Sequence, residues 1–369
     1  MATVVSSSLG DALHDARART LALVAPLSHA QLERVHHPLM SPLCWDLGHI
    51  AAYEDLWLVH RHGGGEPLRA DLANVYDAFE TPRAVRGDIP CLRGGEVFEY
   101  LAAVRRRTLD VLERVGPGDG ALFEMVVRHE AQHNETMRQT LFLAGLPGGR
   151  PPAREDPGAP HDWIEVPAGP FELGAPGGGF SFDNERPRHT VELPAFRIAR
   201  RLATSGSWMR FCEGGGYERR EWWSDEGWAW KEEYDITHPG GWTAGGPADE
   251  EHRPVLHVSW FEADAFARAH GARLPTEAEW EKAATWTQET MQEIGEAWEW
   301  TSSHFRGYPG FLAHPYREYS EVFFGDRYRV LRGASWATEA ILRSPTLRNW
   351  DLPQRRQIFA GVRLAHDAT

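Results

Sequence analysis

Two histidines four residues apart are the part of this sequence best suited to chemistry. They lie in the segment RHEAQHNE, residues 128–135. In a helix, side chains four residues apart share one face, so the imidazoles of His129 and His133 would project together. A third imidazole, His49, ends the segment WDLGH, which we also expect to be helical. Three neutral nitrogen ligands from two helices would hold a metal ion and leave positions open, as catalytic sites do.

A three-histidine metal site explains this histidine spacing better than two alternatives, a chance pair of histidines and a zinc-protease site. The chain has 18 histidines, and pairs four residues apart also arise on solvated helix faces. A zinc protease would need more than the intervening Glu130, because the sequence lacks the downstream glycine and third histidine of the extended signature. The polar residues that follow favour a helix facing a wet pocket. We therefore interpret His49, His129 and His133 as metal ligands.

Helices must position these histidines. Apolar residues at helical spacing between Leu9 and Leu146 predict four helices. The first contains Leu13, Ala16, Leu21 and Leu23, and the others cover residues 43–59, 97–115 and 122–143. Four helices predict a bundle, and bundles build metal sites from side chains on facing helices.

The composition changes beyond this helical region. Prolines and glycines in residues 147–160 predict a linker. Short strands at 163–166 and 171–173, helices at 205–213 and 260–270, and Gly- and Trp-rich loops between 214 and 254 then predict a loop-rich α+β domain. We expect a multidomain protein with an all-α bundle over 1–146, a linker over 147–160 and the α+β domain over 161–369.

Charge and cysteine content exclude several classes of protein. A net charge of −14 at pH 7 and a pI near 5.7 oppose binding to nucleic acid or to an anionic membrane. No apolar run approaches the ~20 residues that span a bilayer, and the amino terminus has no apolar signal core, so we expect a cytoplasmic protein. Cys44, Cys91 and Cys212 are widely spaced and predict free thiols.

Four motifs follow one another in the second half of the chain. They are DNERP at 183–187, RLPTEAEWE at 273–281, WEWTSS at 298–303 and RGASW at 332–336. Together they resemble the formylglycine-generating-enzyme-like fold, a loop-rich relative of C-type lectins. The helical region with its three histidines resembles a DinB-type four-helix bundle. Over nearly the whole chain, the combination is similar to the ergothioneine-biosynthetic sulfoxide synthases, or hercynine oxygenases.

This resemblance implies a reaction. In that family a non-haem Fe(II) held by three histidines, here His49, His129 and His133, uses O2 as a co-substrate. It joins a thiol sulfur to the imidazole carbon between the two nitrogens of hercynine and oxidises the sulfur to a sulfoxide. Three neutral ligands suit this chemistry because they leave adjacent positions for hercynine, thiolate and dioxygen.

The resemblance also implies two sets of substrate-binding residues. Gln132, Asn349 and Trp350 match residues near hercynine. An aromatic face can hold the trimethylammonium group of hercynine, although core packing explains Trp350 nearly as well.

A second set matches residues that bind the thiol, which is γ-glutamylcysteine or cysteine. This set consists of Arg83, Arg86, Asp351 and Arg355. Arginine forks suit the carboxylates of such a substrate, but an ordinary helix surface would show the same spacing of three between Arg83 and Arg86.

A tyrosine acts as proton donor in the family. The best positional match is Tyr316, with Tyr308 as the alternative.

One departure from the family pattern keeps alternatives open. Between Trp286 and Trp298 the chain has only a short, helix-prone stretch where relatives carry a much longer segment. The donor could therefore differ, as in selenoneine synthases, which join a selenosugar to hercynine. A sugar has no carboxylate, so the retained arginines favour an amino-acid thiol.

Proteins of other classes are also conceivable. A non-catalytic, lectin-like ligand-binding protein would carry a metal-free bundle. A formylglycine-generating oxidase needs two copper-binding cysteines in this domain, where only Cys212 is present. A DinB-type thiol transferase would keep three histidines but would have no use for the second domain.

Overall fold

The chain forms two compact units. The computed structural model describes residues 2–153, 155, 162–243, 246–247, 250–286 and 288–368. The first unit comprises Met1–Pro151 together with Glu339–Leu342, and the second comprises Pro152–Thr338 and Arg343–Thr369. Of the predicted linker, residues 147–160, the six residues 154 and 156–160 lie outside the described residues.

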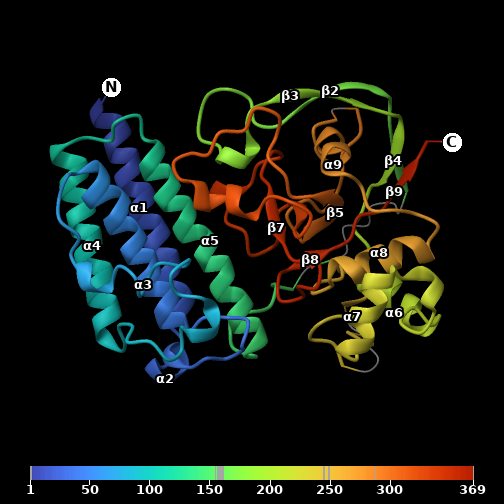
Figure 1. The fold of residues 1–369 in the computed structure, drawn as a ribbon, viewed down its shortest axis with the longest axis horizontal. Helices are drawn as coiled ribbons and strands as arrows, with labels where there is room; N and C mark the ends of the chain where they lie inside the picture. The colour runs from blue at the N-terminus through green and yellow to red at the C-terminus, as the bar shows by residue number, and fades with distance from the viewer. Residues whose placement is uncertain are drawn as a thin grey trace. The chain divides into compact units, whose positions relative to one another are not determined.

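The first unit is a helical bundle. Four long helices run alongside one another in Figure 1: α1 (Ala2–Val24), α3 (Leu43–Glu54), α4 (Gly95–Arg114) and α5 (Ala121–Leu143). A short α2 (His29–Glu33) begins at Ser28, whose hydroxyl caps the helix. Helix α3 continues as the π-helical η1 (Asp55–His62), and two 3-10 turns follow, η2 (Ala70–Leu72) and η3 (Arg83–Val85). The four helices predicted from apolar spacing are confirmed.

A buried ion cluster holds the four long helices together, with one residue from each. Arg17 of α1 donates to Glu130 of α5 and to Glu54 of α3, both at 2.8 Å. Arg105 of α4 donates to Glu54 at 2.7 Å and to Glu130 at 3.0 Å. Burial alone would raise the pKa of Glu54, but the charges of Arg105 and Arg17 outweigh it and lower that pKa. The Glu54 carboxylate thus stays ionised between two guanidinium groups.

A segment from far along the chain also belongs to this unit. The Glu339 carboxylate accepts hydrogen bonds from Arg19 of α1 at 2.6 Å and from Asn134 of α5 at 2.7 Å. Arg128 donates to the carbonyl oxygen of Ile341, in the 3-10 turn η9 (Ala340–Leu342). No local pattern in the sequence indicated this contact.

The second unit is built from short elements. One sheet has the order β1-β4-β9 (Trp163–Val166, Phe196–Ala199, Ala365–Asp367), and β2 (Gly169–Leu173) pairs with β3 (His189–Leu193). A third sheet has the order β7-β6-β5-β8 (Asn349–Asp351, Arg329–Gly333, Trp298–His304, Ala360–Gly361). The helices are α6 (Ser205–Glu213), α7 (Asp225–Glu233), α8 (Trp260–Ala269) and α9 (Glu277–Ala284), with 3-10 turns η4 (Asp183–Glu185), η5 (Arg220–Trp222), η7 (Arg317–Tyr319) and η8 (Glu321–Phe323).

The predicted strands and the helices α6 and α8 are confirmed, so the unit is α+β as expected. Helix α7 lies within the region predicted to be irregular. Its start is fixed by the Ser224 hydroxyl, which accepts a hydrogen bond from the Gly227 amide.

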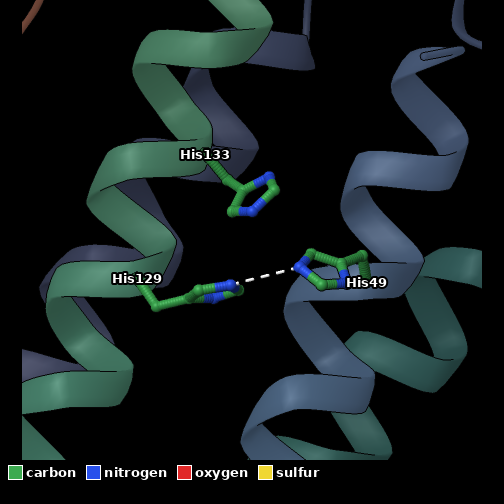
Figure 2. Close-up of side chains that lie close together, drawn as sticks. All are labelled: His49, His129 and His133. Carbon is green, nitrogen blue, oxygen red and sulfur yellow. Dashed lines mark hydrogen bonds between the residues drawn. The ribbon is translucent and has the colours of Figure 1, made fainter. Parts of the chain in front are cut away.

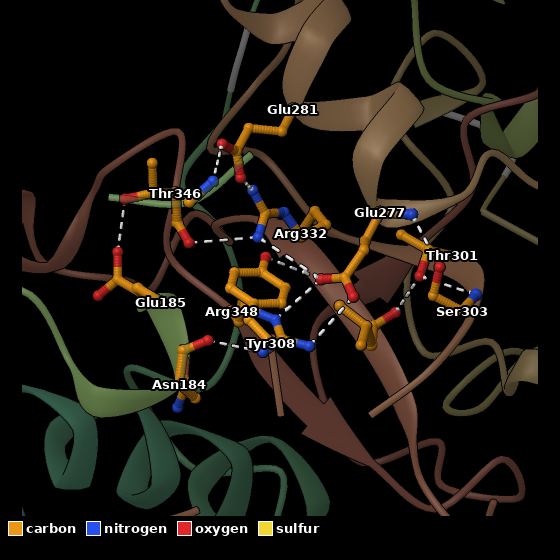
Figure 3. A network of polar contacts seen from close by, with 12 residues as sticks. Asn184, Glu185, Glu277, Glu281, Thr301, Ser303, Tyr308, Arg332, Thr346 and Arg348 are labelled. Carbon is orange, nitrogen blue, oxygen red and sulfur yellow. Dashed lines mark hydrogen bonds and ion pairs between the residues drawn. The ribbon is translucent and has the colours of Figure 1, made fainter. Parts of the chain in front are cut away.

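The four sequence motifs meet in a buried polar network, which Figure 3 shows. Glu281 pairs with Arg332, and Glu277 accepts from Arg348 at 2.8 Å. The Tyr308 hydroxyl lies 3.4 Å from the Glu277 carboxylate. Because Arg348 immediately precedes β7, this network fixes the position of that strand within its unit.

The helix-prone stretch before Trp298 is not a helix, so that prediction is wrong for its described residues, 288–296. Glu293 and Gly295 adopt left-handed φ values of 66° and 96°. The Glu293 carboxylate accepts from the Leu202 amide at 3.0 Å and from Arg201 at 3.1 Å. These buried contacts outweigh local helix propensity.

Two smaller predictions concern the cysteines and membranes. The three cysteines are free, as predicted, and the sulfurs of Cys44 and Cys91 lie 3.9 Å apart in the bundle core. Among the described residues, no helix is long and apolar enough to cross a membrane.

The ion cluster yields a stability prediction. Glu54→Gln should destabilise the helical unit by about 3 kcal/mol, because it leaves two buried guanidinium groups short of a charge partner. Asp110→Asn is the control, since its pair with Arg114 is exposed, with side-chain exposures of 58% and 61%, and should change stability by less than about 0.5 kcal/mol. Urea unfolding followed by circular dichroism at 222 nm measures both. Equal effects of the two variants would contradict the role of the cluster.

Candidate metal centre

Three imidazoles from two helices converge in the first unit. His49 comes from α3, and His129 and His133 come from adjacent turns of α5, so that their rings point toward one another (Figure 2). One ligand atom of each lies within 4.8 Å of the others. The Nε2 atoms of His49 and His129 are 3.1 Å apart. The structure therefore brings together the three residues that the sequence indicated as metal ligands.

Hydrogen bonds on the far side of two rings determine which nitrogen is free. Nδ1 of His49 lies 2.6 Å from the carbonyl oxygen of Tyr76, which can only accept, so this Nδ1 carries the proton. Nδ1 of His133 lies 3.2 Å from a carboxylate oxygen of Asp46. Both contacts leave the Nε2 lone pair directed at the centre of the cluster, as in histidine metal ligands generally.

The cluster fits a divalent metal ion. A metal–imidazole bond is about 2.1 Å, so two ligands at right angles around one ion would be about 3.0 Å apart. The separation of 3.1 Å between His49 and His129 matches this value. Burial, and then the charge of His133, lowers the pKa of both His49 and His129 well below the usual value, so both are neutral, the form that binds metal. A set of three imidazoles with no thiolate suits Fe(II) and its neighbours.

Aromatic side chains of α3 support two of the rings. Trp45 stacks on His49 with ring centroids 5.0 Å apart, and Tyr53 stacks on His129 at 3.6 Å. Trp45, Asp46 and Tyr53 are parts of the site that the motifs in the sequence did not indicate. The available signal was spacing, because residues 45, 49 and 53 are successive positions on one helix face.

The residues between the two histidines of α5 have separate roles. Glu130 is 1% exposed and is engaged by Arg17 and Arg105, so it cannot act as a general base beside a metal ion. This finding excludes the zinc-protease interpretation. Gln132 remains partly exposed on the same helix.

The two predicted arginines of this unit differ in their surroundings. Arg83 begins η3, is exposed, and donates to the Leu39 carbonyl at 3.2 Å. Arg86 is buried, and its guanidinium lies 3.5 Å over the Trp45 ring. It donates to the backbone oxygens of Thr81 and Ala78 and to the hydroxyl of Ser41, at 2.9, 3.2 and 2.9 Å.

Arg86 is a buried cation without an ion-pair partner among the described residues. Burial lowers its pKa to about 10, so the group stays positive at neutral pH. Such a group is suited to receive the carboxylate of a ligand.

Four predicted residues of the second unit lie together. Asn349, Trp350 and Asp351 form β7, which pairs with β6. Arg355 lies 3.8 Å from the Asp351 carboxylate, and both side chains are partly exposed. Trp350 stacks on Phe305 with ring centroids 4.2 Å apart, so one of its faces is already covered.

The two candidate tyrosines are placed differently in this unit. Tyr316 is partly exposed, directly before η7, with its ring against Tyr319 at 6.1 Å. Tyr308 is 6% exposed, and the Arg348 guanidinium lies 4.2 Å over its ring. Burial, followed by the charge of Glu277, raises the pKa of Tyr308. Tyr308 thus belongs to the buried network, whereas Tyr316 is the more accessible phenol.

Two family models match the chain. The "DinB superfamily" model covers residues 12–137, and the "Sulfatase-modifying factor enzyme 1-like domain" model covers residues 151–293 and 289–368. The protein therefore belongs to the class in which a DinB bundle, here with a three-histidine cluster, is joined to a sulfatase-modifying-factor domain.

Full-length relatives define the family within this class. The chain is 42% identical to the hercynine oxygenase of Mycolicibacterium thermoresistibile over 98% of its length and 95% of that protein. It is also 42% identical to the hercynine oxygenase of Mycobacterium tuberculosis over 95% of its length and 97% of that protein. A formylglycine-generating enzyme of Streptomyces coelicolor is 33% identical over only 38% of this chain. The chain belongs to the hercynine oxygenase family, which confirms the resemblance seen in its motifs.

The cluster yields a metal-binding prediction. His133→Ala should lower Fe(II) content after anaerobic dialysis at least tenfold, because the two remaining imidazoles would bind the ion much more weakly. His60→Ala is the control, since His60 is exposed on η1 and bonds the Gly65 carbonyl instead. Elemental analysis of the folded proteins measures the outcome. Wild-type iron content in His133→Ala would show that the metal binds elsewhere.

Proposed function

We propose that this protein is an Fe(II)-dependent hercynine oxygenase that uses O2 to join a thiol sulfur to the imidazole of hercynine, giving a sulfoxide. The observation that carries this proposal is the cluster of His49, His129 and His133 in a chain related over almost its full length to hercynine oxygenases. Bound Fe(II) would supply adjacent coordination positions for both substrates and dioxygen, and would pass electrons to oxygen.

Hercynine is an amino acid with an imidazole, a carboxylate and a trimethylammonium group. We assign its binding to Gln132, Asn349 and Trp350. Trp350 is partly exposed, which leaves room for a cation–π contact beside its stack on Phe305. Gln132 supports the assignment by its position, because it directly precedes the ligand His133 on α5.

The thiol substrate is assigned to Arg83, Arg86, Asp351 and Arg355. Arg86 is buried without a carboxylate among its described contacts. A substrate carboxylate would form an ion pair with its guanidinium group. Asp351 and Arg355 form a loose, partly exposed pair of opposite charges, which suits the ammonium and carboxylate of an amino acid. These charges favour γ-glutamylcysteine or cysteine over the selenosugar of a selenoneine synthase.

A non-catalytic, lectin-like protein is the alternative from another class. Such a protein would have no use for three converging imidazoles, two of them held in the metal-binding tautomer. We further propose that the enzyme acts in the cytoplasm. Its partners would be small molecules and not nucleic acid or an anionic membrane, because a net charge of −14 opposes binding to both.

The direct test is incubation with hercynine, Fe(II), O2 and a panel of donors, read by mass spectrometry. We expect the coupled sulfoxide with γ-glutamylcysteine or cysteine. Coupling with a selenosugar alone would identify a selenoneine synthase. No product with any donor, from protein that binds iron, would refute the proposed function.

The same assay tests the thiol assignment. Arg86→Gln should raise the Michaelis constant for the thiol about tenfold or more and leave that for hercynine unchanged, because a charge-assisted contact of about 1.5–3 kcal/mol is lost. Arg61→Gln is the matched control, since Arg61 also covers a tryptophan, Trp57, at 4.3 Å, but is itself exposed. Equal weakening of both substrates by Arg86→Gln would contradict the division between the two sets.

Tyr316 is proposed to donate a proton during oxygen reduction, because it is the accessible phenol of the two candidates. Tyr316→Phe should shift the product from coupled sulfoxide toward the sulfinic acid of the thiol alone, with oxygen still consumed. Tyr308→Phe is the comparison and should lower stability without changing the product ratio. The ratio of the two products, measured by mass spectrometry, decides between them, and a shift confined to Tyr308→Phe would transfer the role to Tyr308.

A further inference from the structure

We propose that Asp46, together with its neighbour Trp45, is a positioning residue that couples the thiol-binding Arg86 to the iron ligands His133 and His49. The inference rests on the proposed function, because it takes the three histidines as iron ligands and Arg86 as a thiol-binding group. It assigns a role to one turn of α3 that neither the motifs nor the relatives indicate.

The first link joins Asp46 to the metal cluster. Asp46 is 1% exposed, and one of its carboxylate oxygens lies 3.2 Å from Nδ1 of His133. Its other oxygen, Oδ2, is buried and has no hydrogen-bond partner among the described residues. A carboxylate in this position holds the imidazole in one tautomer and increases the electron density that its Nε2 offers to a metal.

The second link passes through Trp45. Its indole contacts two groups: it stacks on the His49 ring at 5.0 Å with an interplanar angle of 10°, and the Arg86 guanidinium lies 3.5 Å over it. The indole is fully buried, and its Nε1 donates to the Val75 carbonyl at 2.8 Å, so it cannot tilt without losing that bond. Arg86 and His49 thus share one fixed packing partner, so a change in the position of Arg86 changes the packing around the His49 ring.

The third link is electrostatic. The negative charge of Asp46 stabilises the buried Arg86 cation, whose described hydrogen bonds go to two backbone oxygens and a hydroxyl. A substrate carboxylate bound at Arg86 would neutralise part of its charge and weaken the attraction between Arg86 and Asp46. Asp46 would then interact more strongly with His133, so that binding of the substrate carboxylate alters the metal site even before a sulfur reaches it. Such coupling is reciprocal by thermodynamic necessity.

The experiment separates this coupling from direct binding of sulfur to the metal. The full-length protein is loaded with Co(II), whose visible absorption reports ligand geometry, and titrated with γ-glutamylalanine. This dipeptide has the carboxylates of γ-glutamylcysteine but no thiol. In the wild type, the dipeptide should shift the Co(II) bands and change the Co(II) dissociation constant.

Asp46→Asn should weaken Co(II) binding about 10- to 100-fold and abolish the spectral shift caused by the dipeptide. Asp46→Glu keeps the charge and should recover part of both effects. Asp55→Asn is the matched control, because Asp55 is another buried aspartate of this helical run, but it binds Arg107 and the Leu68 amide instead of a histidine. It should leave the Co(II) affinity and spectrum unchanged.

The possible failures are distinguishable. If Asp46→Asn binds Co(II) within twofold of wild type and keeps the dipeptide shift, or if the dipeptide binds by equilibrium dialysis without any shift in the wild type, the inference is overturned while the proposed function stands. If His133→Ala retains Co(II), or if the dipeptide does not bind at all, the metal or thiol assignment of the proposed function fails, and the inference fails with it.

Discussion

The buried cluster of Arg17, Glu54, Arg105 and Glu130 is the constraint on which the metal centre depends. Successive helical residues are turned by about 100° around the axis. Because Glu130 must face the two arginines, its neighbour His129 and the later His133 are turned toward α3. Rotation of α3 or α5 would separate buried charges from their partners, which is costly in free energy. The cluster thereby fixes the angular position of the histidines, although it contains none of them.

Helix α3 then supplies most of the support around the cluster. Besides His49 it contributes Trp45, Asp46 and Tyr53, which fix the rings of all three histidines. Gly48 has a related function, because a Cβ atom at this position would lie 2.2 Å from the Tyr76 ring. Only glycine allows Tyr76 to approach closely enough for its carbonyl to accept the proton of His49 Nδ1.

The second unit has many loops and only short helices and strands, so buried polar contacts must stabilise it. Its charged motif residues are buried in mutual ion pairs, such as Glu281 with Arg332 and Glu277 with Arg348. Breaking either pair would leave an unpaired buried charge, so the loops that carry them are held in place. The position of strand β7 is fixed in this way, since Arg348 immediately precedes the residues of β7 that are assigned to substrate binding.

The sequence by itself determined the helices, the histidine triad and the family. Helix periodicity and the spacing of His129 and His133 follow from backbone geometry, which is local, and the four motifs are contiguous strings. It did not determine that Glu130 faces away from the metal, that Asp46 and Trp45 support it, that residues 339–342 join the helical unit, or that Tyr308 is buried. Only tertiary structure decided these points, because partners in buried ion pairs and ring stacks are chosen by packing between distant segments, and such contacts have no characteristic spacing along the chain.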